Sequence, residues 1–387
     1  MKKNADEIIE KFRHITDNTH EYAKSLKAKG HFLAGYMCTH VPEEILYAAG
    51  IIPLRILSSH ESQAMTRSYI HETYCSFSHD CAYQGLQHNY DYLDLIVHSS
   101  SCIHMAEAFN VWLRFAGFQE KSFLITFPHV IHTKHAGKIM VESFIEFKQF
   151  IEKFVKKPIT EDDIERAIKV YNHTRRLLKR LWTFLRRDNP PITGPDVATV
   201  TLAAQVMDKQ EYNQLLDRLI KRLEVSPDKG HPGVRLMVTG GACDDMRVFD
   251  LLEGLNCSTN LIFIDSCSAA RYFWFEVPED RPDKLEAIAE GYISRIPCPS
   301  KDTVPGTGEK KRLRYVQQFI QDFRPDGVVM LYQRFCSPQS MDILALKPIL
   351  KNLGIPSTEL ELDTTVPITQ FGTQLEALVE IIKRVAP

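Results

Sequence analysis

The sequence predicts an α/β protein with two lobes, each built on a parallel sheet and joined by a helical segment. In both halves of the chain, short apolar runs alternate with amphipathic helical patterns, as in parallel sheets with crossover helices. The stretch between them shows almost no strand pattern, and 387 residues exceed what one hydrophobic core usually supports. We divide the chain into an N-terminal helix (1–30), a first lobe (31–156), a helical bridge (157–230) and a second lobe (231–387).

The N-terminal segment and the first lobe show clear element signals. Apolar side chains recur at helical spacing over residues 4–29, which predicts an amphipathic helix. Pro42 and the acids after it predict a helix over 42–50, and Pro53 directs the strand at 51–57 to a sheet edge. The remaining elements expected in this lobe are a strand at 92–97, a helix at 103–115, a strand at 122–127 and a helix at 138–156.

The bridge begins with Thr160 and three acidic residues, which predict a helix start. The helix after it, 164–187, carries eight basic residues. They could face an anion or an acidic partner, although a solvated helix face is the commoner arrangement. Beyond this helix we expect helices at 195–207 and 209–224, then second-lobe strands at 234–239, 261–265, 327–332 and 357–362 and helices at 244–254, 282–294, 309–323, 340–353 and 373–385.

Composition and charge argue against several classes of function. The net charge of −2 provides no field that would attract nucleic acid or an anionic membrane. The N-terminus lacks the apolar core of a signal peptide, and no apolar run is long enough to cross a membrane. We therefore expect a cytoplasmic protein with no nucleic-acid or membrane partner. Its nine cysteines should then be thiols, metal ligands or catalytic groups rather than disulfides.

Two cysteines occupy matching positions in the two lobes. Cys102 closes a polar loop after the strand at 92–97, Cys336 follows the strand at 327–332, and a helix follows each. This repetition suggests an internal duplication. Open α/β sheets bind ligands at the carboxyl ends of their strands, so the two thiols could meet in a cleft if the lobes face each other. Together with Cys75, 27 residues before Cys102, they could hold a cluster from three separate loops and leave one iron open.

The remaining cysteines carry a weaker signal. The chain has no CxxC pair, which disfavours zinc ribbons and ferredoxin-type clusters. Cys81 lies on an expected short helix six residues after Cys75 and is a second-tier candidate. Free cysteine is commonly a small buried side chain, and we expect that role for Cys38, Cys243, Cys257, Cys267 and Cys298.

Other motifs point less clearly to chemistry. Three histidines follow the strand at 122–127 and should be ordinary or substrate-facing, with a metal site as the minority interpretation. Gly240-Gly241 favours a tight turn slightly over anion binding. The chain shows no P-loop, so we expect no nucleotide hydrolysis on it. The histidines are His129, His132 and His135, and the residues near predicted strand ends that could act as a general acid are His129, His132, Asp265 and Tyr272.

Several segments resemble the 2-hydroxyacyl-CoA dehydratase and benzoyl-CoA reductase family. They are HVPEEILYAAGIIPLRIL, YCSF, DLIVHSSSC and DGVVMLYQRFCSPQSMDILALKPILKNLGIPSTELELD. The resemblance covers nearly the whole chain from residue 31. Within the family, the length and motifs are most similar to the smaller of the two cluster-bearing subunits of benzoyl-CoA reductase. The resemblance implies two Rossmann-like lobes joined by helices and a [4Fe-4S] cluster held by Cys75, Cys102 and Cys336, with Cys81 set aside.

The resemblance also implies a function. The chain would be the iron–sulfur subunit of an ATP-dependent benzoyl-CoA reductase, helping to transfer low-potential electrons to the aromatic ring and giving a cyclohexadiene-carbonyl-CoA. Alternatives are a subunit of an (R)-2-hydroxyacyl-CoA dehydratase that works through a ketyl radical, and a non-catalytic electron-carrying or scaffold subunit. The implied partners are a homologous cluster-bearing subunit, ATP-hydrolysing iron–sulfur activator subunits, ferredoxin as upstream donor and an acyl-CoA substrate.

Overall fold

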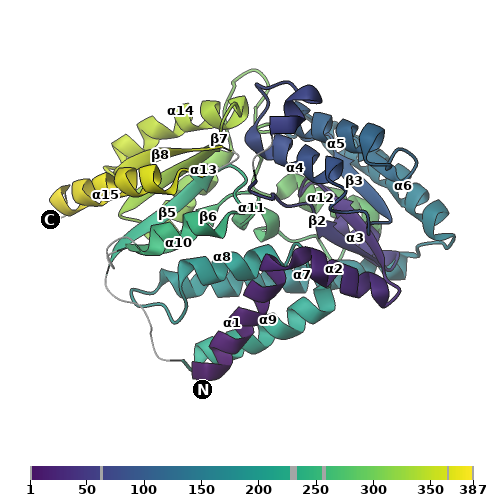
Figure 1. Ribbon diagram of the computed structural model, residues 1–387, viewed down its shortest axis with the longest axis horizontal. Coiled ribbons are helices and arrows are strands. Elements are labelled where there is room, and N and C mark those ends of the chain that lie inside the picture. The colour runs from purple at the N-terminus through teal and green to yellow at the C-terminus, as the bar shows by residue number, and fades with distance from the viewer. Residues whose placement is uncertain (1, 62–63, 227–232, 255–258, 364–365, 386–387) are drawn as a thin grey trace.

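The computed structural model describes residues 2–61, 64–226, 233–254, 259–363 and 366–385. Within them lie two four-stranded parallel sheets with the same topology, β2-β1-β3-β4 and β6-β5-β7-β8 (Figure 1). The α/β class with two parallel sheets is confirmed, and the repeated strand order agrees with an internal duplication. The strands are β1 (Phe32–Tyr36), β2 (Ile51–Arg55), β3 (Leu95–Ser99), β4 (Ser122–Ile125), β5 (Val234–Gly240), β6 (Thr259–Asp265), β7 (Gly327–Gln333) and β8 (Ser357–Leu362).

Helices surround both sheets and fill the space below them in Figure 1. Most lie where the sequence predicts them, with ends shifted by a few residues. In chain order they are α1 (Lys2–Asp17), α2 (Thr19–Ala28), α3 (Glu43–Ala48), α4 (Ser76–Leu86), α5 (Ile103–Phe115), α6 (Ala136–Val155), α7 (Glu161–Thr183), α8 (Gly194–Ala203), α9 (Lys209–Glu224), α10 (Met246–Gly254), α11 (Ala270–Phe273), α12 (Lys284–Ser294), α13 (Arg312–Phe323), α14 (Ser337–Asn352) and α15 (Ile368–Val385).

The first lobe differs from the sequence prediction at one strand. β1 was not expected, yet it lies inside the sheet and pairs with both β2 and β3. Its five residues include Ala34 and Gly35, which are both depleted in strands, so propensity hides it. β2 is the edge strand that Pro53 predicts, since Pro53 pairs with β1 and has no neighbour on its other side.

The N-terminal segment forms two helices instead of the one expected over residues 4–29. The break comes at Asn18, whose backbone leaves the helical region with φ −121° and ψ 43°. The His14 carbonyl accepts from both the side-chain amide of Asn18 at 2.8 Å and its backbone amide at 3.0 Å, as the last bond of α1. Before the break, α1 packs against α8 and α9, so its apolar face joins the helical bridge.

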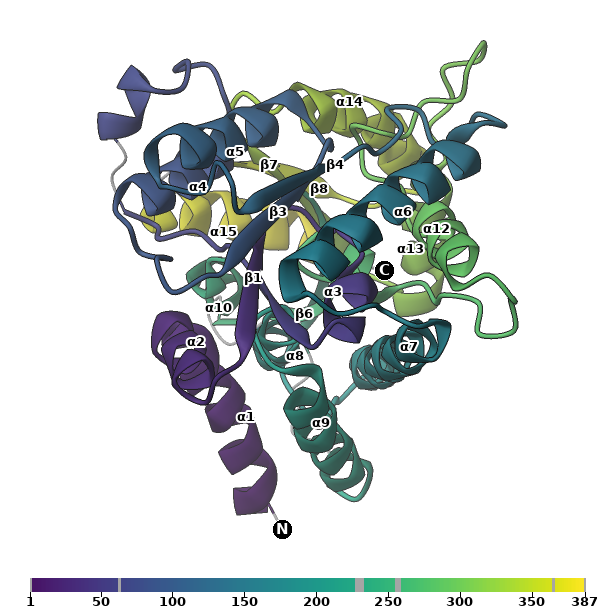
Figure 2. The ribbon, with the colours of Figure 1, turned by 90° about the vertical axis from the view of Figure 1, so that its right-hand side faces the viewer.

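The hydrophobic cores do not follow the order of the chain. α12 comes late in the sequence, among the elements of the second sheet, but it packs against α6 of the first lobe (Figure 2). Ile288 and Tyr292 share one core cluster with Phe144 and Phe147. The lobe boundaries remain a prediction, because this crossing helix belongs to one lobe by sequence and to the other by packing.

Helix α7 carries the basic residues whose role the sequence left open. Its capping box is present: the Thr160 hydroxyl accepts from the Asp163 amide and the Asp163 carboxylate accepts from the Thr160 amide. Most of the basic side chains pair with acids of this chain, which favours a solvated, internally paired face. The pairs are Arg166–Asp163, Lys169–Glu165, Arg176–Glu276, Arg176–Glu279, Lys179–Glu276, Arg180–Glu224 and Arg186–Asp322.

One pair of α7 is buried. Arg175 Nη2 lies 2.5 Å from Glu44 Oε1 on α3, and both side chains are almost fully inaccessible. The Tyr292 hydroxyl of α12 donates to the other Glu44 oxygen at 3.0 Å. This contact therefore joins the bridge, the first lobe and the crossing helix. Among the helices described, none is long and apolar enough to cross a membrane.

We expect Arg175→Met to lower the free energy of unfolding by about 3–5 kcal/mol, because it leaves the Glu44 carboxylate buried without its cation. Urea titration followed by circular dichroism measures the loss. Arg166→Met is the matched control, since Arg166 sits on the same helix in an exposed pair. Similar losses in the two variants would contradict a special role for the buried pair.

Candidate functional site

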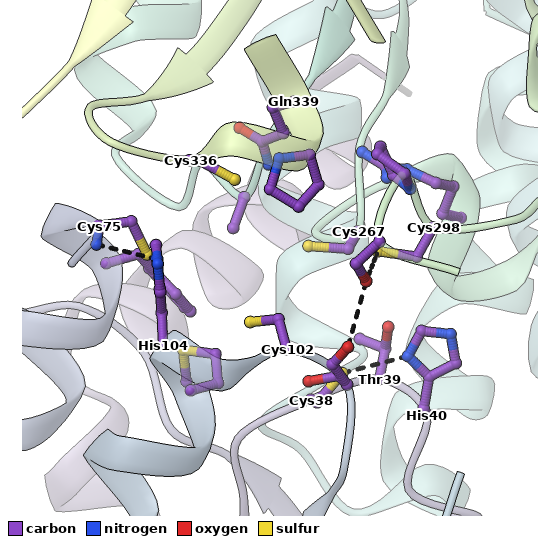
Figure 3. A pocket seen from close by; sticks show the side chains of 18 of the residues that line it. Cys38, Thr39, His40, Cys75, Cys102, His104, Cys267, Cys298, Cys336 and Gln339 are labelled. Atoms are coloured by element: carbon purple, nitrogen blue, oxygen red, sulfur yellow. Dashed lines mark hydrogen bonds between the residues drawn. The ribbon is translucent and has the colours of Figure 1, made fainter. Parts of the chain in front are cut away.

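A cavity of about 340 Å³ lies where the carboxyl ends of the two sheets face each other. It is lined by loops that follow β1 and β3 in the first lobe and β5, β6 and β7 in the second. Parallel sheets bind ligands at this edge, and cofactor sites usually measure about 300–1,000 Å³. We call it the interlobe cavity and define it by the six cysteines in its lining, Cys38, Cys75, Cys102, Cys267, Cys298 and Cys336 (Figure 3).

The three cysteines predicted as ligands share one local structure. Cys75 is the N-cap residue of α4, Cys102 of α5 and Cys336 of α14, and none of the three side chains caps its helix by a hydrogen bond. Three helix N-termini, each with partial positive charge, therefore meet at the cavity. Such termini stabilise thiolates and other anions.

A histidine holds the backbone at one of these cysteines, and burial affects all three thiols. The Cys75 amide donates to His104 Nδ1 at 3.1 Å (Figure 3). The His104 ring stacks on Tyr74 with centroids 4.6 Å apart. Burial raises the pKa of Cys75 and Cys102, and it raises the pKa of Cys336 to about 12. Without a metal the thiols are protonated at neutral pH, so a metal that binds them must displace protons.

The arrangement does not suit a single metal ion. Over the described ranges of the chain, no three His, Cys, Asp or Glu side chains are placed to hold one ion. An iron–sulfur cluster makes a different demand, because each thiolate binds its own iron and the sulfurs stand around a volume. Three thiols that make no helix-capping hydrogen bond and lie on the wall of one cavity are compatible with such a cluster.

The expectation of small buried cysteines does not hold for three of the others. Cys38, Cys267 and Cys298 are each partly accessible and line the interlobe cavity. Cys243 lies in the second-lobe core as expected, and Cys81 is fully buried in α4 outside the cavity lining. Cys257 falls outside the described residues.

One of the three missed cysteines, Cys267, carried a usable signal. Cys267 follows β6, a predicted strand, so the strand-end argument that selected Cys102 applied to it as well. Cys38 follows β1, and it was overlooked because β1 was overlooked. Cys298 lies in the loop after α12 between two prolines, where no strand end marks it.

The polar side chains around the cavity are cationic or neutral. Among the lining residues that the structure describes, none is Asp or Glu. Arg55 donates to the Cys267 carbonyl at 3.0 Å and has Nη2 3.6 Å from its sulfur. Arg295 donates to Thr39 Oγ1 at 3.1 Å. The cavity thus favours a ligand with negative charge.

Of the general-acid candidates, only His129 lines the cavity. His132 Nε2 lies 2.7 Å from the Asp302 carboxylate, Asp265 is buried with Arg312, and Tyr272 donates to a bridge carbonyl. His135 is the N-cap residue of α6. Two further histidines in the lining, missed from sequence, are His40 and His104.

The Gly240-Gly241 pair is a tight turn, the interpretation slightly preferred from sequence. Gly240 has φ +146°, and a Cβ there would stand 1.7 Å from the Leu331 carbonyl oxygen. The Gly240 carbonyl accepts from Arg271, and α10 begins only at Met246. Glycine is required here because the ends of β5 and β7 approach closely.

His98 lies on β3, fully buried, and neither ring nitrogen has a hydrogen-bond partner. Burial and the nearby charge of Lys301 lower the pKa of His98 to about 3. An unfolded histidine has a pKa of about 6.5, so the unfolded chain binds the proton first as the pH falls. The stability linked to His98 is complete above about pH 6.5 and is lost progressively toward pH 3.

We expect His98→Phe to flatten the acid side of the stability profile of the metal-free protein. Between pH 6.5 and 4.5 the wild type should lose about 2 kcal/mol through this one group, which the variant keeps. Urea titrations at several pH values measure the difference. The exposed His173→Gln serves as control, and parallel profiles for wild type and His98→Phe would show that His98 does not titrate as described.

The sequence matches one family model and several known proteins. The family model described as 2-hydroxyglutaryl-CoA dehydratase, D-component, matches residues 38–382. The chain is 27% identical to (R)-2-hydroxyglutaryl-CoA dehydratase subunit beta of Acidaminococcus fermentans, over 96% of this chain and 98% of that one. It is 24% identical to the (R)-phenyllactyl-CoA dehydratase beta subunit of Clostridium sporogenes, over 98% and 100%. It is 23% identical to a benzoyl-CoA reductase subunit of Thauera aromatica, over 79% of each chain.

Proposed function

Because the chain belongs to the 2-hydroxyglutaryl-CoA dehydratase D-component family, we propose that it is the cluster-bearing subunit of an acyl-CoA enzyme. Cys75, Cys102 and Cys336 hold a [4Fe-4S] cluster in the interlobe cavity. The observation that carries the proposal is that these three cysteines, each at a helix N-cap position, meet at one cavity. When bound, such a cluster would supply single low-potential electrons to an acyl-CoA thioester.

The residues of this chain prepare the site for that chemistry. The helix N-termini of α4, α5 and α14 stabilise the negative charge of the bound thiolates. Met37, Phe77, Ile103 and Met105 give the cavity an apolar wall that limits access of water. Exclusion of water is one means by which a protein sets the reduction potential of a cluster.

The reaction we favour is dehydration of an (R)-2-hydroxyacyl-CoA. The two dehydratase subunits named above align with 96–98% of this chain, whereas the reductase subunit aligns with 79%. Reduction of benzoyl-CoA is the second candidate, supported by the YCSF and DLIVHSSSC segments and by that same relative.

The same comparison supports an assembly of several subunits. The relatives are named as subunits, so this chain would work beside a homologous cluster-bearing subunit. The sequence shows no P-loop, so ATP hydrolysis would fall to separate activator subunits that receive electrons from ferredoxin. A non-catalytic role in carrying electrons remains the alternative within such a complex.

We expect Cys75→Ser, Cys102→Ser and Cys336→Ser each to lower the iron content of anaerobically purified protein, because each removes a thiolate ligand. Cys81→Ala and Cys243→Ala are the matched controls, since both thiols are buried outside the cavity lining. Full iron content in all three serine variants would refute the ligand assignment.

The substrate is decided by assaying the complex copurified with this chain. With ATP and a low-potential donor present, (R)-2-hydroxyglutaryl-CoA and benzoyl-CoA are supplied separately and the products identified by mass spectrometry. Loss of water from the hydroxyacyl thioester is the expected result. Formation of a cyclohexadiene thioester, with the hydroxyacyl-CoA unchanged, would establish the reductase instead.

A further inference from the structure

Three cysteines of the interlobe cavity have no part in the proposed function. Cys38 follows β1, Cys267 follows β6, and Cys298 lies in the loop after α12. Chain segments far apart in sequence thus bring three more thiols to the wall of the same cavity (Figure 3). All three are partly accessible, unlike Cys81 and Cys243, which are buried as ordinary core residues are.

Each of the two sets draws its cysteines from both lobes. Cys75 and Cys102 come from the first lobe and Cys336 from the second, whereas Cys38 comes from the first lobe and Cys267 and Cys298 from the second. Two pairs occupy comparable places in the repeated topology. Cys102 and Cys336 follow the equivalent strands β3 and β7, while Cys75 and Cys298 lie in the equivalent connections β2–β3 and β6–β7. Duplicated, facing lobes should offer similar groups on both sides of the cavity.

Polar groups surround the thiols of the second set. Arg55 Nη2 lies 3.6 Å from the Cys267 sulfur. The Cys38 sulfur lies 3.2 Å from His40 Nδ1, and the Cys298 sulfur lies 3.2 Å from the Ser300 hydroxyl. A guanidinium beside one thiol and polar groups beside the other two match a sulfur ligand set better than an apolar packing role.

Burial raises the pKa of the Cys38 thiol, as it does for Cys75 and Cys102. A metal that binds Cys38 must therefore displace a proton there too. Lys301 lies at the cavity edge, where it donates to the Ser100 carbonyl, and its positive charge would stabilise the thiolates once they are metal-bound.

We infer that Cys38, Cys267 and Cys298 bind a second iron–sulfur cluster in the interlobe cavity, beside the one assigned to Cys75, Cys102 and Cys336. The inference rests on the proposed function, because it extends the same cavity and the same cofactor chemistry. Six thiolates in two sets of three suit two four-iron clusters, so one chain would carry about eight irons. The dehydratase and reductase assignments require only the first cluster.

The test counts iron and acid-labile sulfide in the full-length chain after anaerobic reconstitution with ferrous iron and sulfide. We expect about eight irons per chain in the wild type and about four in the variant that combines Cys38→Ser, Cys267→Ser and Cys298→Ser, since each four-iron cluster depends on one set. The control variant that combines Cys81→Ala with Cys243→Ala should keep about eight irons per chain.

The outcomes separate this inference from the proposed function. About four irons in the wild type, unchanged in the triple variant, would overturn the second cluster and leave the first in place. A wild-type protein without iron would refute both the second cluster and the first cluster of the proposed function. A disulfide or free thiols at Cys38, Cys267 and Cys298 in the reconstituted protein, shown by mass spectrometry after alkylation, would also overturn it.

A second measurement tests the inference if the triple variant does not fold. In the chemically reduced wild type, two neighbouring paramagnetic clusters should couple and broaden the electron paramagnetic resonance spectrum. The single variant Cys298→Ser, a change in a loop outside the sheets and helices, should give the narrower spectrum of one isolated cluster. An uncoupled spectrum in the wild type would count against two clusters in one cavity.

Discussion

Two buried guanidinium groups connect the lobes at the edge of the interlobe cavity. Arg55, at the end of β2, donates to the Cys267 carbonyl of the second lobe, and Arg295, after α12, donates to Thr39 of the first. Among the described residues neither has a carboxylate partner, and the Nε atom of each lacks a hydrogen bond. A buried cation is costly unless a negative charge lies near it. The lobes are therefore held together around a site whose buried cations favour an anion inside.

The repeated topology explains why the cavity lies where it does. Both sheets are parallel and have the same strand order, so each has its strand ends and helix N-termini at one edge. When the two edges face each other, partial positive charges from both lobes meet there. The crossing helix α12 and the Arg175–Glu44 pair fix this orientation from outside the cavity. The arrangement of the sheets and the charges around the cavity thus both favour an anionic ligand.

Sequence patterns predicted the fold class and most elements because the hydrophobic periodicity of most of the strands and helices is strong. They missed β1, whose Ala34 and Gly35 are poor strand formers selected by close packing inside a sheet. That single omission also concealed Cys38. The packing of α12 on α6 was out of reach as well, since it depends on contacts between distant segments. Cys102 and Cys336 could be predicted as site residues because the end of a strand is a local sequence signal. The place of Cys298 in the cavity depends on how a loop folds back, which the sequence does not show.

The distribution of the thiols over both lobes also has a consequence for biogenesis. On the proposed assignment, Cys75 is synthesised well before Cys336, with the whole helical bridge between them. Neither lobe alone can complete the ligand set, so a cluster cannot be finished on a nascent chain. On this assignment cluster assembly and the docking of the two lobes are coupled, because the ligands of one cluster come from both lobes.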